Sequence, residues 1–188
     1  MKPQELIRIL TVAERLKCHT RHADTSTGRR ESVAEHSWRT ALMAMLLESE
    51  FPDTDMNKVI RMCLIHDLGE AFTGDIATFD KTEEDTRKEE ELFRKWVQGF
   101  PEEERNQFQE LLQEMEEMRT PEAMLYKGLD KLEAVIQHNE SDISTWLPLE
   151  YELQLTYGER EVKFSPYLTQ LKAYINEMTR EKIQKEGV

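Results

Sequence analysis

The sequence has few cysteines, no long apolar run and a deficit of basic residues. Its two cysteines, Cys18 and Cys63, occur in unrelated contexts, which favours a reducing, cytoplasmic setting and argues against a zinc site built from thiolates. No span approaches the roughly 20 apolar residues of a membrane helix. The first residues also lack the apolar core of a secretory signal. We therefore expect neither membrane binding nor export.

The charge balance disfavours a nucleic acid polymer as partner. The chain has 25 basic and 38 acidic residues, a formal net charge of -13, which would repel DNA or RNA. A small phosphorylated molecule is still compatible with this charge, because cations gathered in a cleft override the global sign there. One such cluster, Arg21, Arg29 and Arg30, precedes the first candidate metal ligand.

Helical periodicity dominates the 188 residues, a length that suits one domain. Caps at Ser32, Asp55 and Thr120 predict three helix starts, and Pro52 predicts a break. The expected helices cover about 3–17, 33–51, 56–68, two segments within 82–119, 121–138, 149–157 and 166–185. Segments 18–30 and 70–80 are expected to be loops, and no segment has a convincing strand pattern. The sequence thus predicts an all-α single domain over 1–188, in which 149–185 packs on a motif region within about 5–140.

Four polar residues in three apolar stretches predict a catalytic metal site: His36, His66, Asp67 and Asp130. His66 and Asp67 follow Met62-Cys63-Leu64-Ile65, where a buried imidazole and carboxylate are costly unless something satisfies both. One divalent ion would do so, and this donor set suits Mn, Fe, Co or Zn. The four ligands carry a net charge of about -2, which neutralises a divalent ion. They also leave coordination positions for water and a phosphate oxygen.

Simpler interpretations exist for each of these residues. His36 alone would be explained as a core histidine bonded to a carbonyl, and Asp67 alone as a solvated helix end. Asp130 would form a surface ion pair with Lys127 or Lys131. By the same reasoning, Trp38 and Trp96 are expected in the core, and His19, His22 and His138 have no motif that assigns them a role.

The motifs around these residues resemble a known enzyme family. They are Ala34-Glu35-His36-Ser37, then His66-Asp67-x-x-Glu70-x-x-x-Gly74-Asp75, and finally Asp130. In order and approximate spacing the chain resembles the HD superfamily of metal-dependent phosphohydrolases, and within it the 5'-deoxynucleotidases, over roughly residues 5 to 140. The resemblance implies an HD-type helical bundle, a homodimer, and removal of the 5'-phosphate from deoxyribonucleoside 5'-monophosphates.

The resemblance also carries roles onto residues near the expected ion. It implies that Asp75 orients or deprotonates the attacking water and that Glu70 handles the proton of the leaving 5'-oxygen, although the two roles are interchangeable at this level. Otherwise Glu70 would cap backbone amides and Asp75 would start the next turn. Arg21 matches a phosphate-binding arginine, whose guanidinium suits phosphate, and Thr78 and Lys81 match weaker substrate positions. The aromatic residue that follows this arginine in bacterial members is His22 here, which puts base stacking there in doubt.

Two other functions are compatible with the same residues. An HD-type site also occurs in enzymes that act on a nucleoside triphosphate, a cyclic dinucleotide or an alarmone. Alternatively, the four ligands would form a structural metal clamp in a non-catalytic helical module, which would have no need for Glu70 and Asp75. The sequence leaves open the metal, the base and sugar preference, and whether Arg29 or Arg30 contacts phosphate.

Overall fold

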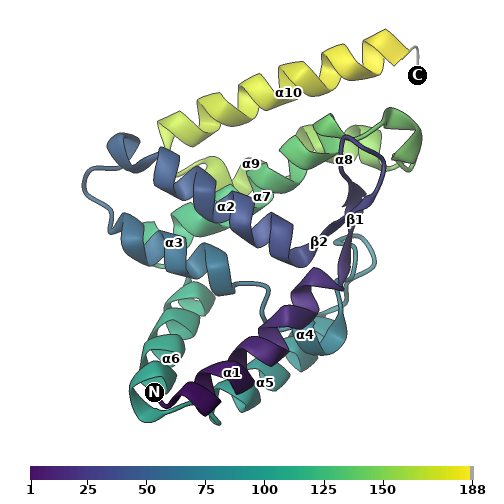
Figure 1. The fold of residues 1–188 in the computed structure, drawn as a ribbon. Coiled ribbons are helices and arrows are strands. Elements are labelled where there is room, and N and C mark those ends of the chain that lie inside the picture. The colour runs from purple at the N-terminus through teal and green to yellow at the C-terminus, as the bar shows by residue number, and fades with distance from the viewer. Residues whose placement is uncertain (187–188) are drawn as a thin grey trace.

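The computed structural model describes residues 1–186 and is built almost entirely of helices (Figure 1), so the predicted all-α class is confirmed. The longer helices are α1 (Pro3–Ala13), α2 (Val33–Leu46), α3 (Met56–Ile65), α5 (Glu83–Val97), α6 (Glu102–Glu117), α7 (Pro121–Glu140) and α10 (Pro166–Glu186). Short α-helices are α4 (Glu70–Thr73), α8 (Glu150–Thr156) and α9 (Glu159–Val162), and 3-10 turns cover Glu14–Lys17, Glu48–Glu50 and Ile143–Thr145.

Helices α2, α3 and α7 form the centre of the molecule, and each begins at a capping residue that the sequence indicates. Ser32 and Glu35 form a reciprocal capping box, in which the Glu35 amide donates to Ser32 Oγ at 3.3 Å. Asp55 accepts from the Lys58 amide at 3.1 Å. The three helices meet along side chains that are fully buried, including Val33, Val59, Met62, Leu125, Leu129 and Leu132.

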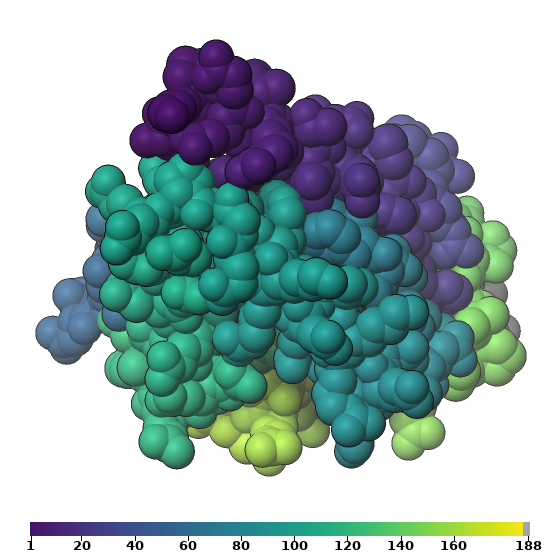
Figure 2. Space-filling view, turned by 90° about the horizontal axis from the view of Figure 1, so that it is seen from below, coloured from purple at the N-terminus to yellow at the C-terminus, as the bar shows by residue number. Residues whose placement is uncertain are grey.

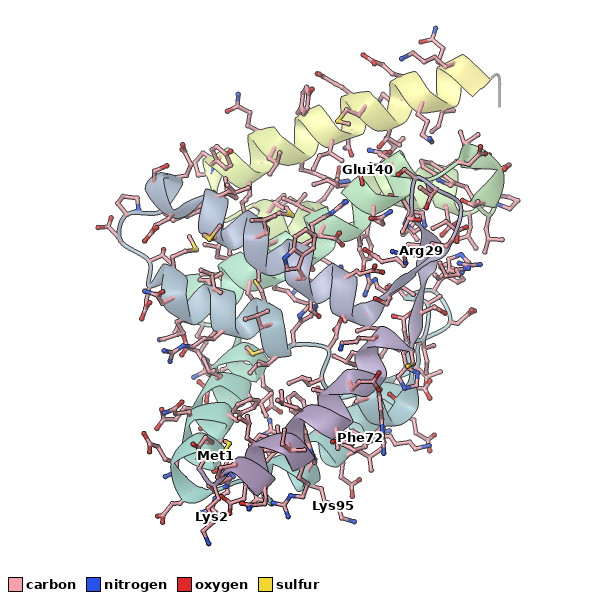
Figure 3. The ribbon with its side chains drawn as sticks, in the orientation of Figure 1. Met1, Lys2, Arg29, Phe72, Lys95 and Glu140 are labelled. Atoms are coloured by element: carbon pink, nitrogen blue, oxygen red, sulfur yellow. The ribbon has the colours of Figure 1, made fainter. Side chains whose placement is uncertain are left out.

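Two further groups of helices flank this centre. Below it in Figure 1, α1, α4, α5 and α6 surround an aromatic cluster in which Trp96 contacts Phe72, Phe93 and Phe100 at ring-centroid distances of 4.7–6.1 Å. Phe72 is labelled in Figure 3. Figure 2 shows this side of the molecule from below, where the purple N-terminal segment with α1 lies beside the teal segments of the chain. Above the centre, α10 packs on α7, α8 and α9.

A small hairpin stands where the sequence predicts a loop. Strands β1 (Thr20–Asp24) and β2 (Arg30–Ser32) pair antiparallel, with Thr20 opposite Ser32 and Asp24 opposite Arg30. The expectation of no strand was wrong here, because the segment is short and polar and lacks the alternation that marks a half-buried strand. Instead, pairing with β2 provides hydrogen-bond partners for the backbone of β1. The hairpin lies beside α7, which β1 contacts.

Three other local predictions need correction. Helix α3 ends at Ile65, before the His-Asp pair, and a turn at 66–69 leads into α4. Gly69 has an ordinary helical φ, and its lack of a side chain lets Glu89 approach, since a Cβ would lie 2.7 Å from Glu89 Cγ. Helix α9 had no predicted counterpart. Trp38 is 61% exposed rather than in the core, because the periodicity of α2 cannot tell which apolar positions a neighbour covers.

Candidate metal centre and adjoining cavity

The four predicted ligands converge from two helices, α2 and α7, and from the turn after α3. His36 Nε2 lies 3.2 Å from His66 Nε2 and 3.3 Å from Asp130 Oδ1. Asp67 Oδ2 lies 3.2 Å from His66 Nε2 and 3.8 Å from His36 Nε2. Asp130 Oδ1 is also 3.7 Å from His66 Nε2. The four residues therefore lie close together. Asp130 also forms the ion pair with Lys127 that its simpler interpretation predicts, although it is 6% exposed rather than at the surface.

Partners on the far side of each imidazole turn both Nε2 atoms inward. The Nδ1 atom of His66 lies 2.8 Å from the Cys63 carbonyl, and that of His36 contacts Glu133 Oε2. The other oxygen of Glu133 lies 2.8 Å from Arg39 Nε. Because each Nδ1 contacts an acceptor, a neutral imidazole at either position would carry its lone pair on Nε2, the atom that faces the cluster, as metal-binding histidines do.

The spacing of the His36, His66 and Asp67 ligand atoms, which lie within 4.8 Å of one another, fits one divalent cation, and Asp130 Oδ1 lies next to both imidazoles. Bonds of about 2.1 Å put neighbouring ligand atoms about 3.0–3.4 Å apart, close to the observed contacts between the imidazoles and the carboxylates. Burial alone would raise the pKa of Asp130, but Lys127 and Lys131 hold it well below its usual range. The carboxylate is therefore charged and available to a cation.

Glu70 and Asp75 lie beside this cluster and line the same cavity. Burial, followed by the charges of Asp67 and Asp75, raises the pKa of Glu70 to about 10. Its Oε2 atom is buried without a hydrogen-bond partner in the described part of the chain, so the alternative of a helix-capping side chain is not observed. Asp75 follows Gly74, whose φ of 76° turns the chain at the end of α4.

The cavity of about 400 Å³ that adjoins the cluster carries several cations. Arg21 lines it from β1, with Nη1 at 3.4 Å from Asp67 Oδ2 and Nε at 3.3 Å from Glu31. Lys127 and Lys131 line it from α7, with their Nζ atoms 2.9 Å and 3.4 Å from Asp130 Oδ2. These cations are paired with carboxylates that line the same cavity, and they offer contacts to an anionic ligand there.

The weaker substrate candidates also line the cavity, whereas the two loop arginines do not. Thr78 Oγ1 lies 3.0 Å from Tyr157 Oη, and Lys81 Nζ lies 2.7 Å from Glu89. Arg29 is on the outer side of the hairpin, where it pairs with Glu35 (Figure 3), and Arg30 pairs with Asp24. The structure thus brings Arg21, Thr78 and Lys81 to the cavity and keeps Arg29 and Arg30 away from it.

Several residues of this region were missed by the sequence reasoning. Lys127 and Glu133 lie three residues on either side of Asp130, so they share its helix face and were a usable signal; Lys131 directly follows it. Glu31, 2% exposed and paired with Arg21, gave no local signal. Glu31 and Glu133 approach each other near His36, but Arg21 and Arg39 already compensate these carboxylates.

The other end of the cavity is formed by histidines around one buried carboxylate. Glu150, 2% exposed, has Oε1 at 3.0 Å from His138 Nε2 and 3.3 Å from His22 Nε2. Its Oε2 accepts from the Leu147 amide at 2.6 Å. His22 packs edge-on against Phe79, with ring centroids 5.3 Å apart. No sequence motif assigns these histidines a role, because only the folding of α8 next to α7 brings them to Glu150.

Comparison with known proteins identifies the family. Residues 13–172 match the model of the HD domain family. The chain belongs to the HD domain family. It is 36% identical to 5'-deoxynucleotidase HDDC2 of Homo sapiens over 146 residues, which are 76% of this chain and 70% of that protein. It is 32% identical to 5'-deoxynucleotidase HDDC2 of Dictyostelium discoideum over 145 residues, 73% of this chain and 71% of that protein.

Solved structures give the same relationship. The crystal structure of a predicted metal-dependent phosphohydrolase from Magnetospirillum magnetotacticum aligns with a TM-score of 0.79 at 26% identity, covering 97% of this chain and 93% of that one. The resemblance to HD phosphohydrolases, and to 5'-deoxynucleotidases among them, is confirmed. Together with the clustered His, Asp and Glu side chains, it supports a divalent metal. No helix in the described residues is long and apolar enough to cross a membrane.

Proposed function

We propose that this HD-family protein is a metal-dependent 5'-deoxynucleotidase, which hydrolyses deoxyribonucleoside 5'-monophosphates to the deoxynucleoside and inorganic phosphate. The observation that carries the proposal is the four-residue donor cluster at the end of a cavity that basic and acidic side chains line together. A donor cluster alone would suit a structural metal. The cavity, with Arg21, Lys127 and Lys131 beside the cluster, supports a phosphorylated substrate instead. The relatives named 5'-deoxynucleotidase support this substrate class.

In this proposal His36, His66, Asp67 and Asp130 hold one divalent ion, either Mn, Fe, Co or Zn, which suit mixed nitrogen and oxygen ligands. When bound, such an ion lowers the pKa of water and offsets charge on phosphoryl oxygens. Glu133 and the Cys63 carbonyl hold the two imidazole rings in the required orientation. Arg21 binds the substrate phosphate through its guanidinium, with Lys127, Lys131, Thr78 and Lys81 around it.

Asp75 and Glu70 divide the proton transfers of the hydrolysis. Asp75 accepts a proton from the water whose oxygen forms the new bond to phosphorus. Glu70, whose pKa burial raises, donates a proton to the 5'-oxygen as the bond between phosphorus and that oxygen breaks. The products are the deoxynucleoside with a free 5'-hydroxyl and inorganic phosphate.

Phosphate release by purified protein tests the proposal. The protein, loaded separately with Mn²⁺, Co²⁺ and Zn²⁺, is expected to release phosphate from dAMP and dTMP. If it binds metal but releases none from any deoxynucleoside monophosphate, the proposal is wrong. Product chromatography with a nucleoside triphosphate, a cyclic dinucleotide and an alarmone then identifies the other HD substrate classes.

Replacement of Glu70 distinguishes an enzyme from a structural clamp. Loss of a positioned proton donor lowers turnover by about 10²- to 10⁴-fold, whereas the four metal ligands are untouched. Glu70→Gln is therefore expected to lose activity and to keep its metal content and Tm. Loss of folding together with metal would favour the clamp.

We also propose that the chain forms one domain, resides in the cytoplasm and associates as a homodimer, as the family resemblance implies. Both cysteines are free, which suits a reducing compartment. On α10, Tyr174 is 61% and Met178 40% exposed, so this helix offers an apolar face to a second copy. Sedimentation of wild type and of Tyr174→Glu tests the dimer: the variant is expected to be monomeric, and a monomeric wild type would contradict it.

A further inference from the structure

The end of the cavity away from the donor cluster carries an aromatic side chain that the proposed hydrolysis does not use. Phe79 lines the cavity and is 36% exposed, so part of its ring is open to a ligand. Its ring is nearly perpendicular to that of His22, with centroids 5.3 Å apart. His22 contacts Glu150, and Glu150 contacts His138. These contacts place Phe79 at the same end of the cavity as the two histidines.

Helix α7 gives the distance between the two ends. Asp130 belongs to the donor cluster and His138 to the far end, and both line the cavity. They are eight residues apart, or about 12 Å along the helix axis. Ala134 and Val135 line the wall between them. In a nucleoside monophosphate the sugar separates the phosphate from the flat base. A phosphate bound at the donor cluster therefore directs the base toward His138 and Phe79.

The chain on both sides of Phe79 is held by hydrogen bonds. The Ala77 carbonyl accepts from the Lys81 amide at 3.0 Å, which closes a turn around Phe79. On the preceding residue, Thr78 Oγ1 lies 3.0 Å from Tyr157 Oη at the end of α8. The phenyl ring is therefore carried by an anchored turn. A ligand that contacts this ring does not first have to order the segment, which favours binding.

Exposure alone does not mark an apolar side chain as a binding residue, because single exposed apolar residues are common on protein surfaces. Phe164 is 37% exposed and is not among the residues that line the cavity. Phe79 differs because it shares the cavity wall with Val135 of α7 and Leu153 of α8. Ligand sites typically combine such apolar and aromatic walls with a few polar groups. This end of the cavity therefore suits a flat ring that carries polar atoms on its edge.

We propose that Phe79 stacks on the base of the nucleotide; this inference rests on the proposed nucleotidase function. Every base has a π-face, so a phenyl ring accepts purines and pyrimidines alike. A purine buries more surface against the ring and gains more from the contact. The imidazole of His22 contacts Glu150 instead, so the stacking surface comes from the loop after α4 rather than from β1. A sugar phosphate without a base makes no such contact.

The test compares substrates with and without a base. In Phe79→Ala, kcat/KM for dAMP is expected to fall about 5- to 150-fold, as for the loss of one base–aromatic stack. The value for dTMP is expected to fall by a smaller factor, and that for 2-deoxyribose 5-phosphate to stay the same. If the sugar phosphate is turned over too slowly, its inhibition constant against dAMP hydrolysis gives the same comparison.

Three further variants separate stacking from a loss of structure. Phe79→Tyr keeps the ring face and is expected to match wild type on all three compounds. Phe164→Ala removes an equally exposed phenyl ring outside the cavity wall and is also expected to match wild type. If circular dichroism shows Phe79→Ala to be unfolded, Phe79→Leu, which keeps an apolar side chain without a ring, takes its place.

The inference is overturned if the folded variant without the ring turns over dAMP like wild type, or loses the same factor on 2-deoxyribose 5-phosphate. It is also overturned if dTMP loses more than dAMP, or if Phe79→Tyr is as impaired as Phe79→Ala. Failure of the proposed function is distinct, because wild type itself would then release no phosphate from dAMP or dTMP.

Discussion

Replacement of Glu133 by glutamine should weaken metal binding although Glu133 is not itself a candidate ligand. Its carboxylate accepts from His36 Nδ1 on one oxygen and contacts Arg39 Nε at 2.8 Å on the other. Glutamine keeps the shape and an acceptor oxygen but removes the charge. Loss of such a partner of a metal-binding histidine costs about 10- to 100-fold in metal affinity.

The effect on the metal can be separated from the effect on folding. Removal of the charge also leaves Arg39 without its buried partner, and breaking a buried ion pair costs about 3–5 kcal/mol. Glu140 contacts the same arginine, with Oε2 at 2.6 Å from Arg39 Nη1, but its side chain is 46% exposed and does not touch His36. Glu140→Gln is therefore the matched control for the arginine.

The assay is titration of metal-free protein with Mn²⁺ by calorimetry at a temperature at which circular dichroism shows each variant to be folded. Glu133→Gln is expected to have a Kd about 10- to 100-fold above wild type, and Glu140→Gln a Kd equal to wild type. Equal Mn²⁺ affinity in all three proteins would refute the reasoning that Glu133 orients His36 for a metal.

Three further predictions concern pH, backbone strain and metal removal. Burial lowers the pKa of Lys172 from 10.5 to about 8; the unfolded chain therefore binds more protons between these values, and stability rises with pH across them by up to about 3 kcal/mol. Lys172→Met should lack this gain in urea unfolding at pH 8 and 10.5, and an equal gain in both proteins would contradict the burial. Gly74 has φ 76° and ψ 169°, which costs other residues about 1–3 kcal/mol, so Gly74→Ala should lower kcat/KM by displacing Asp75. Gly28→Ala, strained by φ 80° in the hairpin turn, should lower stability but not kcat/KM. Equal kcat/KM in Gly74→Ala and Gly28→Ala would contradict the displacement of Asp75. Removal of the metal by a chelator should abolish activity and lower Tm, and Mn²⁺ should restore both. A Tm that does not change with the metal would argue against the buried site.

The features that the sequence predicted are those with a local physical cause. Ser32, Asp55 and Thr120 cap helices because a side-chain oxygen three residues before a free amide is sufficient to start one. The expected ligands cluster because each is a polar side chain within an apolar segment, where burial demands a partner. Whether that partner is a metal remains a prediction.

The features that the sequence did not predict depend on contacts between distant segments. Nothing within Thr20–Asp24 favours a strand until Arg30–Ser32 pairs with it. Trp38 is exposed because no helix within residues 1–186 covers it. The contact of His22 and His138 with Glu150 arises only when α8 folds back beside α7. Local pattern therefore identified the donor cluster and missed the opposite end of the cavity.

The unequal contribution of α7 and α8 to the cavity has a consequence for how related proteins can diverge. Helix α7 supplies Asp130, Glu133 and His138, so an inserted or deleted residue between them would rotate one end of the cavity by about 100° relative to the other. Helix α8 supplies no candidate ligand. Selectivity for different substrates can thus evolve, or be engineered, on α8 by single replacements, while α7 tolerates little change in length.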